Sequence, residues 1–114
     1  MQRGEIWSVT LPFATGGREQ SGQRPAIVLQ DTVYGQGSPL VLVVPLTSQL
    51  GALRFPATTQ IDPSVQNGLT ASSIALVFQT RALDRTRFVR RVGTLSADEL
   101  ASVLEELNNL TGQI

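Results

Sequence analysis

Residues 40–48 read LVLVVPLTS, which is the strongest strand signal in the chain. The continuous apolar run at residues 40–44 predicts a strand that is buried on both faces. Because Pro45 cannot donate a hydrogen bond to a β-ladder, we expect the strand to end there. Thr47 and Ser48 would then lie at the exit of the strand, where two adjacent hydroxyls are available for a site.

Shorter segments on both sides of this stretch predict further strands. Apolar and polar residues alternate at residues 6–11, which predicts a half-buried strand. The other strands are expected at residues 26–29, 54–59, 71–78 and 88–92. Polar, glycine-rich sequence at residues 12–23 predicts a loop, and residues 34–39 predict a turn.

The C-terminal segment predicts an amphipathic helix. Ser96 and Glu99 have the spacing of a capping box, and Gly112 supplies a stop. Apolar residues recur at helical spacing between them: Leu100, Val103, Leu104, Leu107 and Leu110. We therefore predict a mostly β protein, a small antiparallel barrel with a C-terminal α-helix, and expect residues 1–114 to form a single domain.

The residue inventory restricts the chemistry. The 114 residues include no histidine and no cysteine, and every basic residue is arginine. This excludes thiol nucleophiles, Ser-His-Asp triads, the usual zinc sites and a P-loop lysine. The acidic residues are scattered, so no carboxylate cluster for magnesium is predicted. The remaining side chains suit phosphoryl chemistry, where positioning and charge stabilisation do most of the work, and we expect neither a metal nor a cofactor.

The charges balance overall but are segregated. The formal net charge is zero, which argues against a protein that holds nucleic acid by bulk charge. Residues 81–91 nevertheless contain five arginines and one acid, whereas residues 96–114 contain four acids and no base. This arginine-rich segment can bind an RNA backbone, or it can be ordinary solvated surface. No signal peptide and no apolar run near the ~18 residues of a membrane span is found, so we expect a cytoplasmic protein.

Two polar clusters qualify as candidate sites by their placement. Residues 18–20, Arg-Glu-Gln, lead through a glycine to Arg24, just before an apolar strand. Thr47 and Ser48 form the second cluster. Each has a plain structural alternative, because an Arg before Pro is usually a surface residue and a Thr-Ser pair after a strand is usually a turn or cap.

Several short blocks occur in order along nearly the whole chain. They are RGEIW at 3–7, GREQSGQRPAIV at 17–28, VPLTS at 44–48, QTRALD at 79–84 and VGTL at 92–95. In this order, they resemble the MazF/PemK family of toxin endoribonucleases. Each block alone is weak, and the ordered set carries the resemblance.

The resemblance implies an SH3-like barrel with an appended helix, a homodimer, and cleavage of single-stranded mRNA at short motifs. The products would carry 2′,3′-cyclic phosphate and 5′-hydroxyl ends, and a cognate MazE-like antitoxin would block the site. The family's Arg-Pro arginine falls on Arg24 and its threonine on Thr47, which makes these two the expected catalytic residues. Supporting or RNA-binding roles are expected for Arg18, Glu19, Gln20, Ser48, Gln79 and Arg81.

The sequence departs from the family pattern in two places. Arg18 stands where the family usually has histidine. Leu76 and Phe78 stand where some members carry an arginine and an aspartate. A mechanism built on that Arg/Asp pair is therefore absent here, which shifts the expected catalytic weight onto Arg24 and Thr47.

Two other functions remain compatible with the sequence. One is a non-catalytic toxin of the same fold that binds and poisons a DNA topoisomerase. The other is a barrel that only binds nucleic acid or protein. For an endoribonuclease, we expect base specificity to come from loops such as residues 49–54 and 67–71.

Overall fold

The computed structural model describes residues 1–12, 22–30 and 37–112. The described residues form seven strands: β1 (Glu5–Leu11), β2 (Gly22–Val28), β3 (Leu40–Thr47), β4 (Thr58–Ile61), β5 (Ser73–Leu76), β6 (Arg81–Asp84) and β7 (Phe88–Thr94). Three short 3-10 helices, η1 (Leu50–Arg54), η2 (Val77–Gln79) and η3 (Arg85–Arg87), and the helix α2 (Ala97–Thr111) complete the described part. None of the described helices is long and apolar enough to cross a membrane.

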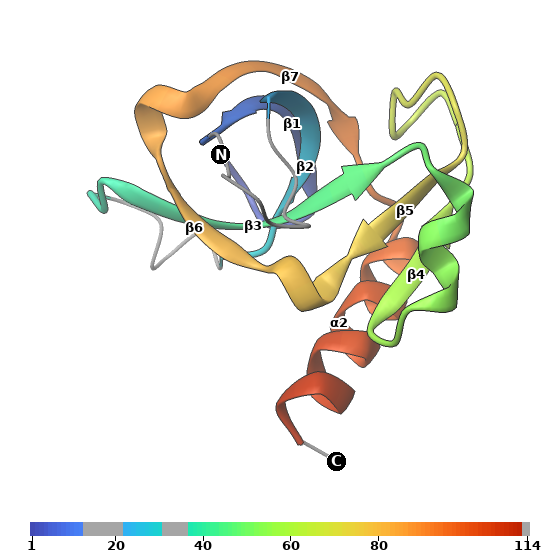
Figure 1. The fold of residues 1–114 in the computed structure, drawn as a ribbon. Helices are drawn as coiled ribbons and strands as arrows, with labels where there is room; N and C mark the ends of the chain where they lie inside the picture. The colour runs from blue at the N-terminus through green and yellow to red at the C-terminus, as the bar shows by residue number, and fades with distance from the viewer. Residues whose placement is uncertain (13–21, 31–36, 113–114) are drawn as a thin grey trace.

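All strand pairs are antiparallel, and the strands follow the order β4-β5-β3-β2-β1-β7, with β6 paired to β3. The sheet curls into a ring formed by β1, β2, β3, β6 and β7, and α2 packs below β4 and β5 (Figure 1). No ladder joins β6 to β7 among the described residues, so the barrel is not closed by hydrogen bonds. The prediction of a mostly β, barrel-like fold with a C-terminal helix is confirmed.

Strand β3 is the hub of the sheet, and the predictions for it were wrong in two respects. The strand continues past Pro45, because Leu46 and Thr47 pair with β5 after the β2 ladder has ended. It is not buried on both faces along its whole length, since Leu40 and Leu42 are 46% and 36% exposed. Its first four residues pair with β6, which leaves these two side chains on the outer surface.

Other predicted boundaries were also corrected. The second strand begins at Gly22 rather than residue 26, because β1 continues to pair with it upstream of Pro25. Residues 54–59 were predicted as one strand, but residues 50–54 are the helix η1 and only β4 is extended. Residues 71–78 contain β5 followed by η2.

Two further differences concern the strands β6 and β7. β6 was not predicted, because its sequence RALD buries only Leu83 and lacks a strand pattern. The last strand was predicted at residues 88–92 and runs two residues further, to Thr94. Most of the loop predicted at residues 12–23 and the first half of the turn predicted at 34–39 lie outside the described residues.

Two apolar clusters hold the structure together. The larger lies under α2 and joins residues such as Ile6, Leu46 and Val77 to Val103 of the helix. The other lies on the opposite face of β1 and β2 and contains Val9, among others. The helix begins and ends as predicted, with a Ser96–Glu99 capping box and a left-handed Gly112, although Leu110 remains 49% exposed.

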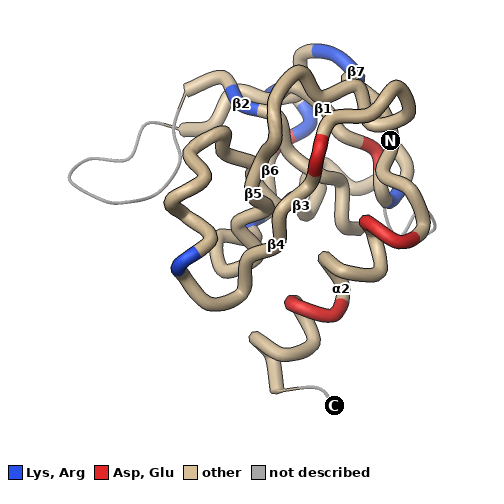
Figure 2. The backbone as a smooth tube through the Cα atoms, turned by 90° about the vertical axis from the view of Figure 1, so that its right-hand side faces the viewer, with Lys and Arg blue, Asp and Glu red and all other residues tan. Residues whose placement is uncertain are grey.

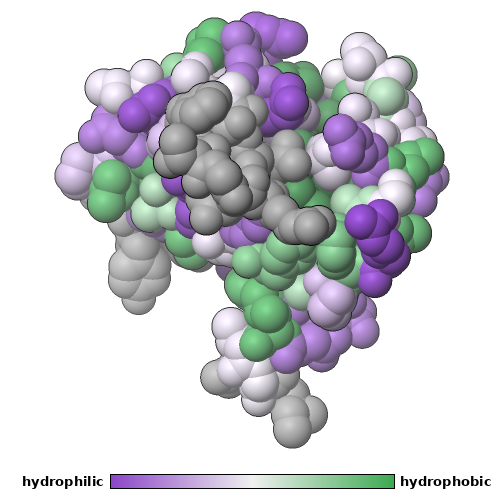
Figure 3. Space-filling model, in the orientation of Figure 1, coloured by the Kyte–Doolittle hydropathy of each residue, from purple (hydrophilic) through white to green (hydrophobic). Residues whose placement is uncertain are grey.

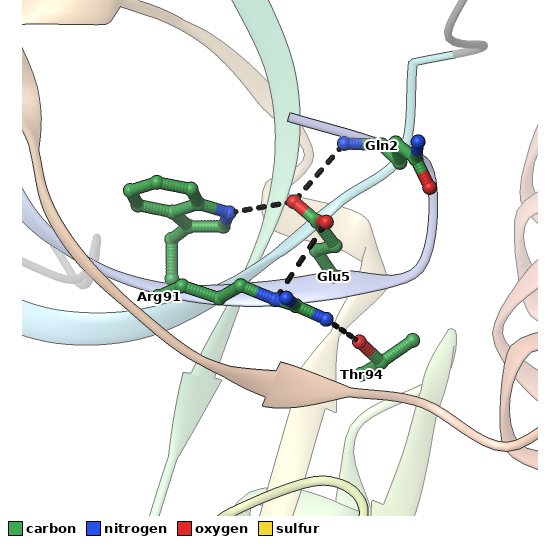
Figure 4. Close-up of polar contacts among 5 residues, drawn as sticks. Gln2, Glu5, Arg91 and Thr94 are labelled. Carbon is green, nitrogen blue, oxygen red and sulfur yellow. Dashed lines mark hydrogen bonds and ion pairs between the residues drawn. The ribbon is translucent and has the colours of Figure 1, made fainter.

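A polar clip holds β1 against β7 (Figure 4). The carboxylate of Glu5 accepts hydrogen bonds from Trp7 Nε1 at 2.9 Å and from the Gln2 backbone N–H at 3.1 Å. It also forms an ion pair with Arg91, whose Nε lies 3.6 Å from Glu5 Oε2. Burial would raise the pKa of Glu5, but the two hydrogen bonds and the Arg91 charge together hold it below its ordinary value of 4.5.

The segment that we call the Asn67 loop, residues 62–72, is fixed to α2 and β7. The buried Asn67 donates through Nδ2 to the Asp62 carbonyl at 2.8 Å and to Glu99 Oε2 at 3.1 Å. The other carboxylate oxygen of Glu99 accepts the Ser96 N–H of the capping box at 2.8 Å. A methyl group added to Gly93 would lie 2.3 Å from the Asn67 carbonyl oxygen, so the loop and β7 touch through their backbones.

Candidate active site

A cleft opens where the ladder between β2 and β3 ends. The last paired residues are Ala26 and Pro45, and beyond them β3 turns to pair with β5 through Leu46 and Thr47. Continuing the register by two residues past the last pair sets Arg24 of β2 opposite Thr47 of β3. Because the two strands diverge here, Arg24 and Thr47 lie on either side of a cleft instead of being neighbours in a continuous ladder.

This cleft, which we call the Arg24 cleft, has a volume of about 400 Å³. It is lined by Gln23, Arg24, Pro25, Leu46, Thr47, Ser48, Gln49, Leu69, Thr70, Ala71 and Ser73. The sequence-predicted pair Arg24 and Thr47, together with Ser48, therefore line one cavity, although they come from segments more than twenty residues apart.

Arg24 lies on an edge of the sheet. It pairs with Val9 of β1 on one side, while on the other side the β3 ladder has already ended. Its side chain is exposed, and one guanidinium nitrogen donates to the carbonyl of Gln23 at 3.2 Å. The following Pro25 fits this edge, because a proline is tolerated in a strand where no partner needs its missing N–H. Arg24 is thus within β2, and the prediction that it lies in a loop before the strand was wrong.

Thr47 is held rigidly at the end of β3. Only 6% of the residue is exposed, and its Oγ1 accepts the backbone N–H of Gln49 at 3.2 Å. This bond uses a lone pair of the hydroxyl oxygen, so the hydroxyl proton can still be donated to a ligand in the cleft. Ser48 follows as an exposed residue at the rim.

The Asn67 loop forms the wall opposite these residues through Leu69, Thr70 and Ala71. Asn67 Oδ1 accepts the backbone N–H groups of Ser64 at 2.9 Å and Leu69 at 3.0 Å, which fixes the path of the loop into the cleft. Hydrogen bonds from Gln60 and Ser72 lower the pKa of the Asp62 carboxyl at the start of the loop. Sequence reasoning missed the role of Asn67, because only its burial against α2 distinguishes it from a turn residue.

A second cleft of about 320 Å³ adjoins the first, and we call it the phenylalanine cleft. Thr47 and Gln49 line both clefts, so the two cavities are neighbours. The remaining lining residues come from η1, β5 and η2: Gly51, Ala52, Arg54, Phe55, Leu76, Phe78 and Gln79. The loop predicted to set base specificity at residues 49–54 therefore lines this second cleft, and the loop at residues 67–71 lines the first.

The other predicted site residues are distributed differently. Gln79 lines the phenylalanine cleft rather than the Arg24 cleft. Arg81 lies on β6 opposite Val43 and is not among the lining residues of either cleft. Arg18, Glu19 and Gln20 lie outside the described residues.

The arginine-rich segment has partly structural roles. Arg85 Nε donates to the Ser38 carbonyl at 2.6 Å, and Arg91 belongs to the clip with Glu5. Arginine positions mark β2 and β7 in the upper part of Figure 2 and acidic positions mark α2 in the lower part, with further acidic positions beside β1 and the N-terminus. Within residues 1–12, 22–30 and 37–112, no three acidic side chains gather into a group that could hold a metal ion.

The sequence and the fold are similar to those of known proteins. The family model described as "PemK-like, MazF-like toxin of type II toxin-antitoxin system" matches residues 2–111. Endoribonuclease MazF9 of Mycobacterium tuberculosis is 35% identical over 112 residues, covering 94% of this chain and 92% of that protein. The crystal structure of MazF from Deinococcus radiodurans has a TM-score of 0.79 and 32% identity, covering 99% of this chain and 97% of the other. A MazE–MazF crystal structure from the same organism has a TM-score of 0.71 and 28% identity, covering 100% and 97%.

Proposed function

Because the chain belongs to the PemK-like, MazF-like toxin family of type II toxin-antitoxin systems, we propose that it is a sequence-specific, metal-independent endoribonuclease that cuts single-stranded mRNA. The observation that supports this proposal best is the meeting of Arg24, Thr47 and Ser48 in one cleft. The endoribonuclease name of the Mycobacterium tuberculosis relative supports it independently.

In the proposed reaction, the ribose 2′-hydroxyl attacks the adjacent phosphorus. The new P–O2′ bond forms as the P–O5′ bond breaks; the proton of the 2′-hydroxyl passes to a base, and the leaving O5′ takes up a proton from solvent. The products are a 2′,3′-cyclic phosphate and a 5′-hydroxyl. The attacking and leaving oxygens must lie in line through phosphorus, a geometry that a stacked duplex disfavours and a splayed single strand allows. The substrate is therefore single-stranded RNA.

Arg24 is the transition-state stabiliser in this mechanism. Its guanidinium can donate two parallel hydrogen bonds to the nonbridging oxygens, on which negative charge accumulates. Thr47 donates a hydrogen bond from its hydroxyl to the same phosphate, and its fixed position makes this donation preorganised. Ser48 supports the pair from the rim.

The proton acceptor for the 2′-hydroxyl is a separate assignment. An arginine stays protonated at any ordinary pH and is a poor base. None of the described residues that line the Arg24 cleft is acidic. We assign the role to Glu19, the carboxylate nearest to Arg24 in sequence. If this is right, Glu19→Gln changes the pH–rate profile, and an unchanged profile removes Glu19 from the role.

The proposed cellular setting is the one that the family resemblance implies. The chain acts in the cytoplasm as a homodimer, and a MazE-like antitoxin, acidic and flexible, covers the cleft. The MazE–MazF structure from Deinococcus radiodurans supports the antitoxin partner. Sedimentation of the purified chain with and without the antitoxin measures both associations. The relatives described above give no support to a topoisomerase-poisoning function.

The decisive experiment is cleavage of single-stranded RNA in the presence of EDTA, with the cut ends mapped. Arg24→Ala and Thr47→Val should each lower kcat/KM at least ~100-fold while circular dichroism stays native, since each removes a donor to the transition state. The matched controls Arg3→Ala and Thr59→Val, which lie outside both clefts, should cut normally. Near-normal cutting by folded Arg24→Ala would refute the catalytic assignment, and loss of activity in EDTA would refute metal independence.

A further inference from the structure

Two aromatic rings that line the phenylalanine cleft are not part of the apolar core. Phe55 and Phe78 are 37% and 39% exposed, and neither belongs to an apolar core cluster. Their ring centroids lie 5.9 Å apart with an angle of 58° between the planes. The two residues come from different elements, the end of η1 and the middle of η2, so the fold brings the rings together. Two exposed rings that line a cavity are available to a ligand with a flat apolar face.

Polar groups lie beside the rings in the same cleft. The Arg54 guanidinium carbon lies 4.6 Å from the centroid of the Phe55 ring, a cation–π arrangement. The Gln49 and Gln79 amides, which can both donate and accept hydrogen bonds, also line the cleft. On the visible face of the molecule, apolar side chains gather in the lower half, with hydrophilic ones beside them (Figure 3).

Rings for stacking, a guanidinium plane and amides at the edge are the groups by which proteins hold an unstacked nucleobase. An apolar side chain of a protein partner would need the rings but not the guanidinium and the amides. The volume of about 320 Å³ also lies at the small end of ligand pockets, roughly 300–1,000 Å³.

The position of the cleft supplies the second argument. Thr47 and Gln49 form a boundary shared with the Arg24 cleft, where the scissile phosphate is proposed to lie. A nucleotide attached to that phosphate therefore has the phenylalanine cleft beside it. Phe78 also stands where some family members carry aspartate, so this position offers a ring here and a carboxylate in those members.

We propose that the phenylalanine cleft binds one nucleobase of the RNA, from a nucleotide next to the scissile phosphate, by stacking on Phe55 and Phe78. Gln49 forms hydrogen bonds with the edge of that base. Arg54 holds the Phe55 ring in place, and its planar guanidinium is a second surface on which the base can stack. This inference rests on the proposed endoribonuclease function. It assigns Phe55 and Phe78 as specificity-determining residues and predicts a position of the cut motif at which the base itself is required.

The test combines protein variants with abasic substrates. An RNA oligonucleotide containing the mapped cut site is prepared intact and with a single abasic nucleotide at each position around the cut. For the native protein, one adjacent abasic position should lower kcat/KM about tenfold or more. Phe78→Ala and Phe55→Ala should lower kcat/KM on intact RNA by a similar factor. They should then lose nothing further on that abasic substrate, because the ring and the base act as one pair.

The controls separate stacking from general damage. Phe78→Tyr keeps a ring and should retain most of the activity, whereas Phe78→Leu keeps apolar volume without a flat face and should behave like alanine. Leu110→Ala removes an exposed apolar side chain outside both clefts and should leave the abasic pattern unchanged. Circular dichroism of each variant checks the fold.

Each other outcome overturns the proposal in a distinguishable way. If the phenylalanine variants stay as sensitive to every abasic position as the native protein, no base occupies the cleft. If they cut all substrates equally poorly and sediment as smaller species, the cleft is a contact between two copies of the chain. If the native protein cuts no RNA, the proposed function fails as well, whereas cutting without coupling overturns this inference alone.

Discussion

The two segments that flank Thr47 are held in different ways. The Asn67 loop is fixed by contacts distant in sequence, through the bond from Asn67 to Glu99 and the backbone contact with Gly93. The segment at residues 49–55, which we call the η1 wall, is held mainly by local bonds, such as Ala52 N–H to the Gln49 carbonyl at 3.0 Å.

Their exposure differs as well. Asn67 is completely buried, whereas Leu50 and Leu53 of the η1 wall are 50% and 47% exposed. The cleft proposed for catalysis is thus backed by a wall whose geometry belongs to the core. The cleft proposed for base recognition is backed by a wall whose exposed side chains can be substituted at small cost in stability. Residues of the cleft proposed for base recognition can therefore be substituted without disturbing the geometry of the cleft proposed for catalysis.

The largest expected effect breaks the fixed wall. In Gly93→Ala, the new methyl group would meet the Asn67 carbonyl oxygen at 2.3 Å and the Gln66 carbonyl oxygen at 2.7 Å. Because backbone atoms cannot move without disturbing the loop, we expect a loss of about 3 kcal/mol in the free energy of unfolding, measured by urea denaturation. The matched change in the η1 wall, Gly51→Ala, meets only the flexible end of Arg54 at 3.3 Å and should stay within about 0.5 kcal/mol. Equal losses would show that the two walls do not differ.

Asn67→Ala comes next, with an expected loss of about 2 kcal/mol. The substitution leaves the Ser64 and Leu69 N–H groups and the Asp62 carbonyl without their partner. Thermal or urea unfolding measures it, with the exposed helix residue Asn109→Ala as the control. A loss no larger than the control's would mean that the loop is held by packing alone.

A smaller effect, about 1 kcal/mol, is expected for Ser96→Ala. The serine hydroxyl accepts the Glu99 N–H at 3.1 Å, and caps of this kind contribute about that much. The comparison is Ser102→Ala, whose hydroxyl donates to the Asp98 carbonyl within the helix and should have little influence. If Ser102→Ala destabilises as much as Ser96→Ala, the capping box does not carry this stability.

The smallest effect is a dependence on pH at the start of the Asn67 loop. Hydrogen bonds from Gln60 and Ser72 place the pKa of Asp62 below 3.8 in the folded chain. Stability from the carboxylate is therefore present at neutral pH and lost as pH falls through the lowered pKa. Asp62→Asn should remove this part of the acid sensitivity, seen as a shallower fall in unfolding free energy between about pH 5 and pH 2. An identical slope would exclude Asp62 as a contributor.

The sequence predicts well what neighbouring residues decide. The capping box at Ser96 and the stop at Gly112 are local signals, and the helix begins and ends there. β6 escaped prediction because it is a strand only through its pairing with β3. Pro45 was misread for a related reason: the strand survives it because β3 exchanges one partner for another at that residue.

The candidate site divides along the same line. Arg24 and Thr47 could be paired from the family pattern, and the register of β2 and β3 gives a physical reason for their juxtaposition. The partnership of Phe55 and Phe78 could not be predicted, because the residues are far apart in the chain and each reads as an isolated exposed aromatic. Asn67 escaped for the same reason, since its partner Glu99 lies 32 residues away.

The carboxylate of Glu99 has one oxygen bonded to the Ser96 N–H and the other to Asn67. Unwinding the first turn of α2 therefore also breaks one of the bonds that fix the loop backing the proposed catalytic cleft. Amide protons of the two segments should exchange with solvent through a common opening, as a single cooperative unit, although they are separate in sequence. A partner that binds the start of this helix would therefore slow the local opening of the cleft wall without entering the cleft.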